Sequence, residues 1–121
     1  TTALDHFQTP RNLGEIDLPD AVAEVENPAC GDRARLSLRI VDGRITEARF
    51  LAEGCPAAIA AASMTTVLLT GATLADARAL RDVDVANALD GLPPNKVHCS
   101  VLAEDVIREA LDAYDAGVPS R

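Results

Sequence analysis

Two stretches of alternating residues, joined by the dipeptide Asp42-Gly43, constrain the fold of this chain most strongly. In residues 35–41 apolar side chains alternate with polar ones, which is the period of a strand with one buried face. Residues 44–51 return as a second extended segment. Because Asp and Gly both tolerate the positive φ angles of a tight two-residue turn, the sequence predicts a β-hairpin here.

A third strand and an irregularity in the second can also be predicted. Within residues 44–51 the apolar positions change parity between Ile45 and Ala48, which indicates either a β-bulge or a strand face that is not cleanly one-sided. Residues 21–26 alternate small or apolar side chains with polar ones and end before Pro28. We therefore expect an antiparallel sheet of three strands, all in the first half of the chain.

The pattern becomes helical from Cys55 onward. Pro56 suits the first turn of a helix, where its missing N–H costs nothing. Residues 57–70 are apolar on nearly every side, so this helix should be central and buried, and Gly71 is a plausible stop. Further helices are expected over residues 4–8, 73–80, 83–89 and, as a long amphipathic element, 100–116. Strands followed by helices predict an α+β fold: a two-layer domain, spanning residues 1–121, in which the sheet packs against a set of helices.

Composition excludes several classes of function. The chain has 121 residues and a net charge of −8, with 48% hydrophobic and 25% charged residues, which is ordinary for one globular domain. The negative charge and the small number of aromatic residues argue against nucleic-acid binding. No apolar run approaches the ~20 residues needed to span a bilayer. The N-terminus has no signal-peptide pattern, so we expect a cytoplasmic protein without membrane contact.

The cysteines are the main chemical feature. There are three, and their odd number in a protein expected to be cytoplasmic argues against a disulfide framework. Cys30 lies in a loop bounded by Pro and Gly, where strands are expected to end. Cys55 and Cys99 lie at predicted helix N-termini, where unpaired N–H groups and the positive end of the helix stabilise a thiolate.

Three thiolates and a fourth ligand are what tetrahedral Zn²⁺ or an iron–sulfur cluster requires. His98 and Asp32 are the available fourth groups, each close in sequence to a cysteine. Spacing alone is weak evidence, because the chain has no C-x-x-C pair. Taken singly, Cys55 is equally well a small buried apolar residue, and Asp32 is a turn residue. The combination of these residues is what indicates a metal or sulfur site.

At these positions the chain resembles a known family, the iron–sulfur cluster assembly scaffolds of the IscU type, equivalent to the N-terminal domain of NifU. The resemblance runs in order from residue 5 to about residue 114. The matching segments are residues 5–7 (DHF), 10–12 (PRN) with Gly14, 27–32 (NPACGD), 42–45 (DGRI), 54–55 (GC), 58–60 (AIA), 92–100 (LPPNKVHCS) and 102–103 (LA). Each segment is weak evidence alone, but their ordered series is highly specific.

The resemblance implies a platform on which a cluster, typically [2Fe–2S], is built and then released to apo iron–sulfur proteins. A cysteine desulfurase would supply sulfur as persulfide, and an iron donor would supply iron. No small-molecule substrate would be turned over, so the role would be non-enzymatic. The resemblance covers the scaffold domain alone, without the additional cluster-binding domains of full-length NifU.

Carried over position by position, the resemblance implies ligands at the three cysteines and an exchangeable fourth ligand. These residues are Cys30, Cys55 and Cys99, with His98 or Asp32 as the fourth. Cys99 would also be the persulfide acceptor, and Lys96 would tune access to the site. Asp32 would keep the cluster labile, because a hard carboxylate is a poorer partner than a fourth thiolate. Zn²⁺ is an alternative occupant of the cluster-free form.

Some alternatives stay open at this point. A zinc-bound sulfurtransferase of the SufU type would have a longer segment between its second and third cysteines and no counterpart of His98. A small interaction domain with structural zinc would need neither Asp32 nor Lys96, and a thiol hydrolase built on His98 and Cys99 lacks a third, orienting group. In the family, the segment at residues 92–96 docks an Hsp70-type chaperone. Asn95 stands there in place of the common valine, so chaperone docking is left open, as is a homo-oligomer.

Overall fold

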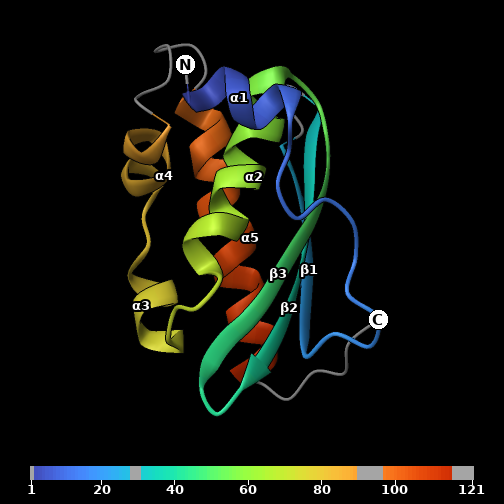
Figure 1. Cartoon of the computed structure of the whole chain (residues 1–121), viewed down its shortest axis with the longest axis vertical. Helices are drawn as coiled ribbons and strands as arrows, with labels where there is room; N and C mark the ends of the chain where they lie inside the picture. Colours follow the sequence, from blue (N-terminus) through green and yellow to red (C-terminus); the bar gives the residue numbers. More distant parts are fainter. Residues whose placement is uncertain (1, 28–30, 90–96, 116–121) are drawn as a thin grey trace.

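A computed structural model describes residues 2–27, 31–89 and 97–115, with the backbone alone for residues 2–4, 27 and 97–100. Its elements confirm the predicted α+β class (Figure 1). In chain order they are α1 (Thr2–Gln8), β1 (Ala21–Asn27), β2 (Asp32–Val41), β3 (Arg44–Glu53), α2 (Pro56–Leu69), α3 (Leu74–Ala79), α4 (Asp82–Ala88) and α5 (Val97–Asp115).

The three strands form one antiparallel sheet in the order β1-β2-β3, as predicted. The hairpin turn has Asp42 and Gly43 at φ angles of +52° and +75°, the conformation that this dipeptide favours. The β-bulge is also confirmed. Its ladder pairs Arg39 with Glu47 but Ile40 with Ile45, so one residue of β3 is extra and the apolar parity shifts.

Helices α2 and α5 cover one face of the sheet (Figure 1). Leu36 and Leu38 of β2 are almost completely buried, and Leu38 shares a hydrophobic cluster with Ile107 and Leu111 of α5. A second cluster joins α2 to α4 and α5; its members are Ala58, Ala60, Ala61, Met64, Val85, Leu89 and Ala103. Helix α2 is apolar on nearly every side because these neighbours and α1 enclose it on several sides.

Two elements begin earlier than the sequence pattern predicts. Strand β2 begins at Asp32 instead of residue 35, because its first residues pair with the end of β1, from Asn27 back to Val25. This pairing extends the strand through residues 32–34, in which apolar and polar side chains do not alternate clearly enough to predict a strand. Helix α5 begins at Val97 instead of residue 100, so Cys99 lies within its first turn. The prediction that Cys55 and Cys99 lie at helix N-termini is confirmed.

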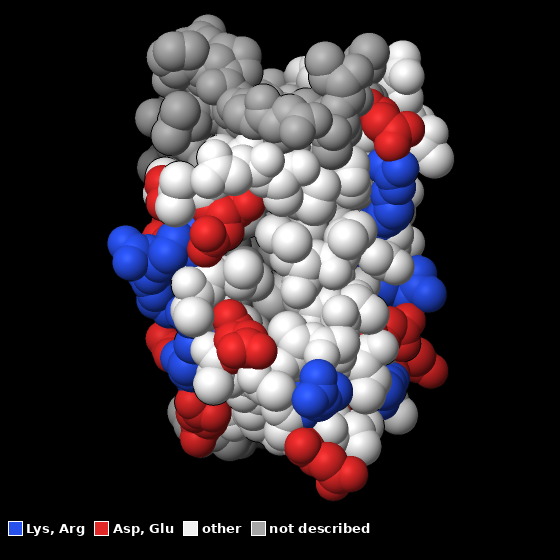
Figure 2. Space-filling model, turned by 60° about the vertical axis from the view of Figure 1, so that its left-hand side comes forward, with Lys and Arg blue, Asp and Glu red and all other residues white. Residues whose placement is uncertain are grey.

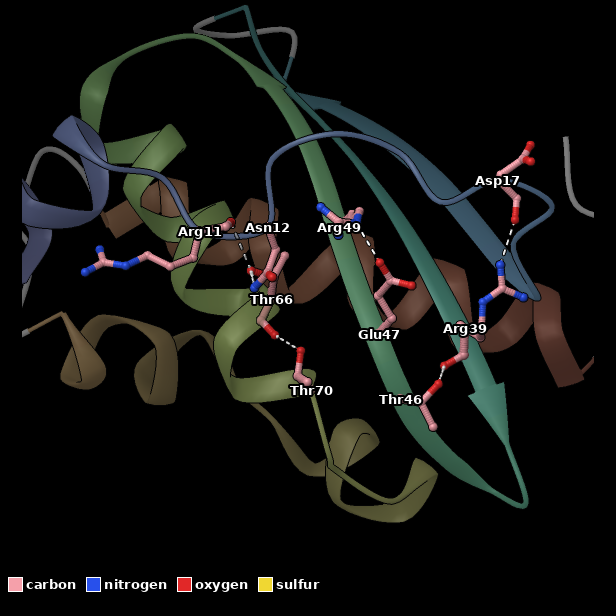
Figure 3. Close-up of polar contacts among 9 residues, drawn as sticks. All are labelled: Arg11, Asn12, Asp17, Arg39, Thr46, Glu47, Arg49, Thr66 and Thr70. Carbon is pink, nitrogen blue, oxygen red and sulfur yellow. Dashed lines mark hydrogen bonds and ion pairs between the residues drawn. The ribbon is translucent and has the colours of Figure 1, made fainter.

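The segment from residue 9 to residue 20 crosses the other face of the sheet (Figures 1 and 3). It begins at the edge of β3, where the Phe50 N–H donates to the Asn12 carbonyl over 3.0 Å. It then reaches β2, where Arg39 Nη2 donates to the Asp17 carbonyl over 2.7 Å. Ser37 lies on this face of β2 and is nevertheless only 2% exposed. The segment therefore connects α1 to β1 across the sheet face opposite the one that α2 and α5 cover.

A polar clasp fastens the N-terminal segment to α2. The Ser63 hydroxyl lies 2.7 Å from Nδ1 of the buried His6 and accepts the backbone N–H of Arg11 over 2.9 Å. One turn further along α2, Asn12 Nδ2 donates to Thr66 Oγ1 over 3.0 Å (Figure 3). These polar groups of α2 are buried but satisfied, so they cost little to bury.

The His6 clasp predicts a pH dependence of stability. Burial lowers the pKa of His6 below its ordinary value of 6.5, with a smaller effect from the nearby Arg11 charge. The unfolded chain therefore binds the proton more readily. The stabilisation is complete well above pH 6.5 and is lost as the pH falls below that value. We expect the free energy of unfolding in urea to decrease between pH 7 and pH 5.

His6→Gln is the control for this titration, because glutamine is polar but does not ionise in this range. Its stability should change less over the same pH interval than that of the parent chain. Because both chains contain His98, the difference between their two pH profiles isolates His6. Parallel profiles would show that the buried imidazole has no such linkage.

Charged side chains are interspersed on the molecular surface. On the face shown in Figure 2, acidic and basic residues are interspersed along both margins and in the lower half, and a broad uncharged area lies between them. Ion pairs near the surface include Arg78 with Asp112 and Arg81 with Glu104. In the part of the chain that the structure describes, no helix is both long and apolar enough to cross a membrane.

Candidate functional site

Three elements that carry predicted site residues begin at the same end of the molecule (Figure 1). Arg33 at the start of β2 pairs with Glu53 at the end of β3, which places the start of β2 next to the connection into α2. Ala103 near the start of α5 and Ala58 near the start of α2 share one hydrophobic cluster. The starts of β2, α2 and α5 therefore lie close together.

Asp32 and Cys55 are in direct contact at this end. The Cys55 N–H donates to Asp32 Oδ1 over 3.1 Å, and the Cys55 thiol lies 3.8 Å from Oδ2 as its donor. Asp32 is only 2% exposed, whereas Cys55 is half-buried. The carboxylate is thus fixed against a thiol that is still accessible from outside.

Local sequence explains why the carboxylate lies there. Cys55 is the N-cap residue of α2, but its side chain makes no capping hydrogen bond, and Pro56 after it has no N–H. A helix start needs acceptors for its unpaired N–H groups and favours negative charge. Asp32 supplies both from the neighbouring strand. It therefore acts as a cap to α2 as well as a neighbour of the thiol.

The predicted site residues are described to different extents. Asp32 and Cys55 are brought together, although Asp32 is the first residue of a strand and not a turn residue. The backbone of His98 and Cys99 lies in the first turn of α5. Cys30 and Lys96 lie outside the described residues, as does the segment at residues 92–96. Their roles as ligands and sulfur acceptor stay predictions.

The described side chains supply two potential metal ligands at this end, the Cys55 thiol and the Asp32 carboxylate. Within residues 5–26, 31–89 and 101–115, no three His, Cys, Asp or Glu side chains come together as metal ligands. A thiolate and a carboxylate are nonetheless both competent ligands for iron and zinc, the first soft and the second hard. From the sequence, Gly54 is visible only as part of a matching segment, because its positive φ of +139° leaves no signal in the pattern beyond the glycine itself.

Comparisons with known proteins give the family of the chain. Residues 1–119 match the family model of the NifU-like N-terminal domain. The iron–sulfur cluster assembly scaffold protein IscU 1 of Archaeoglobus fulgidus is 46% identical over 110 residues, covering 91% of this chain and 72% of that protein. IscU of Escherichia coli K12 is 43% identical over 115 residues, covering 92% and 89%.

Solved structures support the same fold. The N-terminal part of a NifU-like protein from Brucella abortus matches with a TM-score of 0.64 at 24% identity, covering 97% of this chain and 87% of that one. A putative iron–sulfur cluster assembly scaffold protein for the SUF system from Fervidobacterium islandicum matches with a TM-score of 0.73 at 20% identity, covering 91% and 93%. Because the family model matches residues 1–119, nearly the whole sequence, the chain belongs to the NifU-like N-terminal domain family.

Proposed function

We propose that this chain is a scaffold on which an iron–sulfur cluster, [2Fe–2S] in type, is assembled and from which it is released to apo-proteins. The observation that carries the proposal is the buried Asp32 carboxylate fixed against the Cys55 thiol, at the end where β2, α2 and α5 begin. The names of the relatives from Archaeoglobus fulgidus and Escherichia coli support the same role.

The ligand set that we propose combines described and undescribed residues. Cys55 and Asp32 supply a thiolate and a carboxylate, and Cys30 and Cys99 supply two further thiolates. His98 is the other candidate for the fourth position. A carboxylate among thiolates suits a scaffold, because a hard ligand on a thiolate-bound iron exchanges more readily than a fourth thiolate.

Sulfur enters as persulfide in this proposal. The Cys99 thiolate attacks the terminal sulfur of the persulfide carried by a cysteine desulfurase. One S–S bond breaks, a new one forms on Cys99, and the desulfurase cysteine leaves as thiolate. Reduction to sulfide then takes an electron pair from a separate donor. The start of α5, where the backbone of Cys99 lies, would favour an anionic sulfur on this residue, and Lys96 would tune access to it.

The partners follow from this sequence of steps. They are a cysteine desulfurase, an iron donor and apo iron–sulfur proteins. Docking of an Hsp70-type chaperone at residues 92–96, a homo-oligomer, zinc in the cluster-free form and a cytoplasmic location stay predictions. We also propose that residues 1–121 act as one domain and that the role is assembly without turnover of a small-molecule substrate.

Anaerobic reconstitution tests the proposed function. The protein is incubated with Fe²⁺, cysteine and a catalytic amount of cysteine desulfurase, and visible absorption is followed. Sulfide-to-iron charge-transfer bands that grow with time and then disappear on addition of apo-ferredoxin would support a scaffold. Persulfide on Cys99 with no chromophore and one tightly held zinc would instead favour the SufU-type sulfur carrier.

Cys99→Ser is expected to abolish sulfur acceptance, because a hydroxyl neither attacks a persulfide at neutral pH nor holds the transferred sulfur. The measurement is the mass of the protein after incubation with desulfurase and cysteine, without iron. The matched control is Cys55→Ser, which should still gain sulfur at Cys99. Persulfide labelling that is unchanged in Cys99→Ser would refute the assignment.

A further inference from the structure

We infer that Gly54 is a positioning residue of this site: its lack of a side chain is what allows the Asp32 carboxylate to lie against Cys55. This inference rests on the proposed function for its meaning, but its geometry is independent of any bound cluster. Gly54 separates β3 from the N-cap of α2 and itself carries no ligand atom.

The space next to Gly54 is filled by Asp32. A Cβ built on Gly54 would lie 2.1 Å from Asp32 Oδ1, 2.8 Å from its Cγ and 3.1 Å from its Cα. The first two distances are shorter than any real Cβ contact. The Oδ1 atom in question is the one that accepts the Cys55 N–H. Any side chain at position 54 therefore displaces the acceptor that caps α2 and faces the thiol.

Asp32 has little room to yield. Its side chain is only 2% exposed, and its backbone is held by pairing with Asn27 of β1. The carboxylate can leave Gly54 only by rotating its short side chain, which takes Oδ1 away from the Cys55 N–H. Any residue with a side chain at position 54 would thus move the Asp32 carboxylate away from Cys55, although Asp32 itself is unchanged.

The test has to separate this clash from backbone strain, because Gly54 has a φ of +139°, which side chains rarely adopt. Gly14 provides the matched control. Its φ is +126°, and nothing lies within 4 Å of a Cβ built there. Gly14→Ala therefore measures the strain alone, whereas Gly54→Ala measures strain together with the displacement of Asp32.

The experiment compares Gly54→Ala, Gly14→Ala, Asp32→Ala and the double variant Gly54→Ala/Asp32→Ala in the metal-free protein. The readouts are amide hydrogen exchange at Cys55, by NMR, and the urea midpoint of unfolding. We expect exchange at Cys55 to rise at least about tenfold in Gly54→Ala and Asp32→Ala, the size of losing one hydrogen bond to a charged group. Gly14→Ala should leave it unchanged.

The double variant decides whether Asp32 is the cause. Removing the Asp32 carboxylate removes the clash and also the hydrogen bond to Cys55. The double variant should therefore lose about the sum of the urea-midpoint losses of Gly14→Ala and Asp32→Ala, and it should fold even if Gly54→Ala alone does not. A midpoint loss in the double variant as large as the Gly54→Ala and Asp32→Ala losses added together, or protection of the Cys55 amide in a folded Gly54→Ala, would overturn the inference.

Cluster retention links the inference to function. After reconstitution, Gly54→Ala should release its cluster to apo-ferredoxin as slowly as Asp32→Ala, since both take the carboxylate out of the site. Release at the parent rate from a folded Gly54→Ala would count against the inference. If the parent protein forms no cluster, the proposed function fails, while the exchange and midpoint data still decide the role of Gly54.

Discussion

Cys55→Ser is expected to abolish stable cluster formation without any loss of folding stability. Serine is among the best N-cap residues, and Cys55 is the N-cap of α2, where its own side chain makes no capping hydrogen bond. The free energy of unfolding should therefore stay unchanged or rise by up to about 1 kcal/mol. The backbone N–H of residue 55 can still donate to Asp32.

The cluster should be lost because a serine hydroxyl is a much harder and less acidic ligand than a thiol, and iron–sulfur clusters are held by thiolates. The measurement is the visible absorption of the reconstituted protein, beside its urea unfolding curve. Ala57→Ser, which adds a hydroxyl two residues further along the chain and keeps the thiol, is the matched control and should retain the chromophore. Wild-type absorption and lifetime in Cys55→Ser would remove Cys55 from the ligand set.

The separation of these two effects makes the Cys55 experiment decisive. Most substitutions at a buried site lower stability, and a destabilised scaffold could lose its cluster for that reason alone. At position 55 the capping chemistry predicts the opposite direction for stability. A folded, normally stable variant without chromophore therefore points to the sulfur atom itself.

The sheet could be predicted from sequence in most of its detail. The Asp42-Gly43 turn and the parity change between Ile45 and Ala48 are local signals, and both the hairpin and the bulge are confirmed. The start of β2 could not be predicted, because Asp32 and Arg33 are strand residues only through their pairing with β1 and β3. Where a strand ends depends on the strands that pair with it, and the local sequence pattern does not show the register of that pairing.

The site shows the same division. Cys55 could be placed at a helix start from Pro56 alone, since proline is favoured there. The Asp32–Cys55 hydrogen bond could not, because it depends on the register that brings Arg33 opposite Glu53. The clasp between His6 and Ser63, separated by 57 positions, likewise arises only from the packing of α1 on α2. Local chemistry was visible in sequence, and contacts between elements were not.

Asp32→Ala is expected to make the fold less stable and yet to slow cluster release. Removing the carboxylate leaves the half-buried Cys55 N–H without this acceptor, which should lower the free energy of unfolding by about 1–3 kcal/mol. Cluster release to apo-ferredoxin should become slower, because the hard ligand that promotes exchange is gone. The measurements are urea unfolding of the metal-free protein and the time course of cluster transfer.

Asp32→Asn separates the two roles of this side chain. Its amide oxygen can still accept the Cys55 N–H, so the loss of stability should be smaller than in Asp32→Ala. It no longer carries a carboxylate charge, so release should be slow in both variants. If Asp32 were only a helix cap, cluster transfer would follow stability, and Asp32→Asn would transfer at nearly the parent rate. Slow transfer from both variants, with unequal stabilities, would instead show that the carboxylate makes the site labile and that its oxygen holds α2 in place.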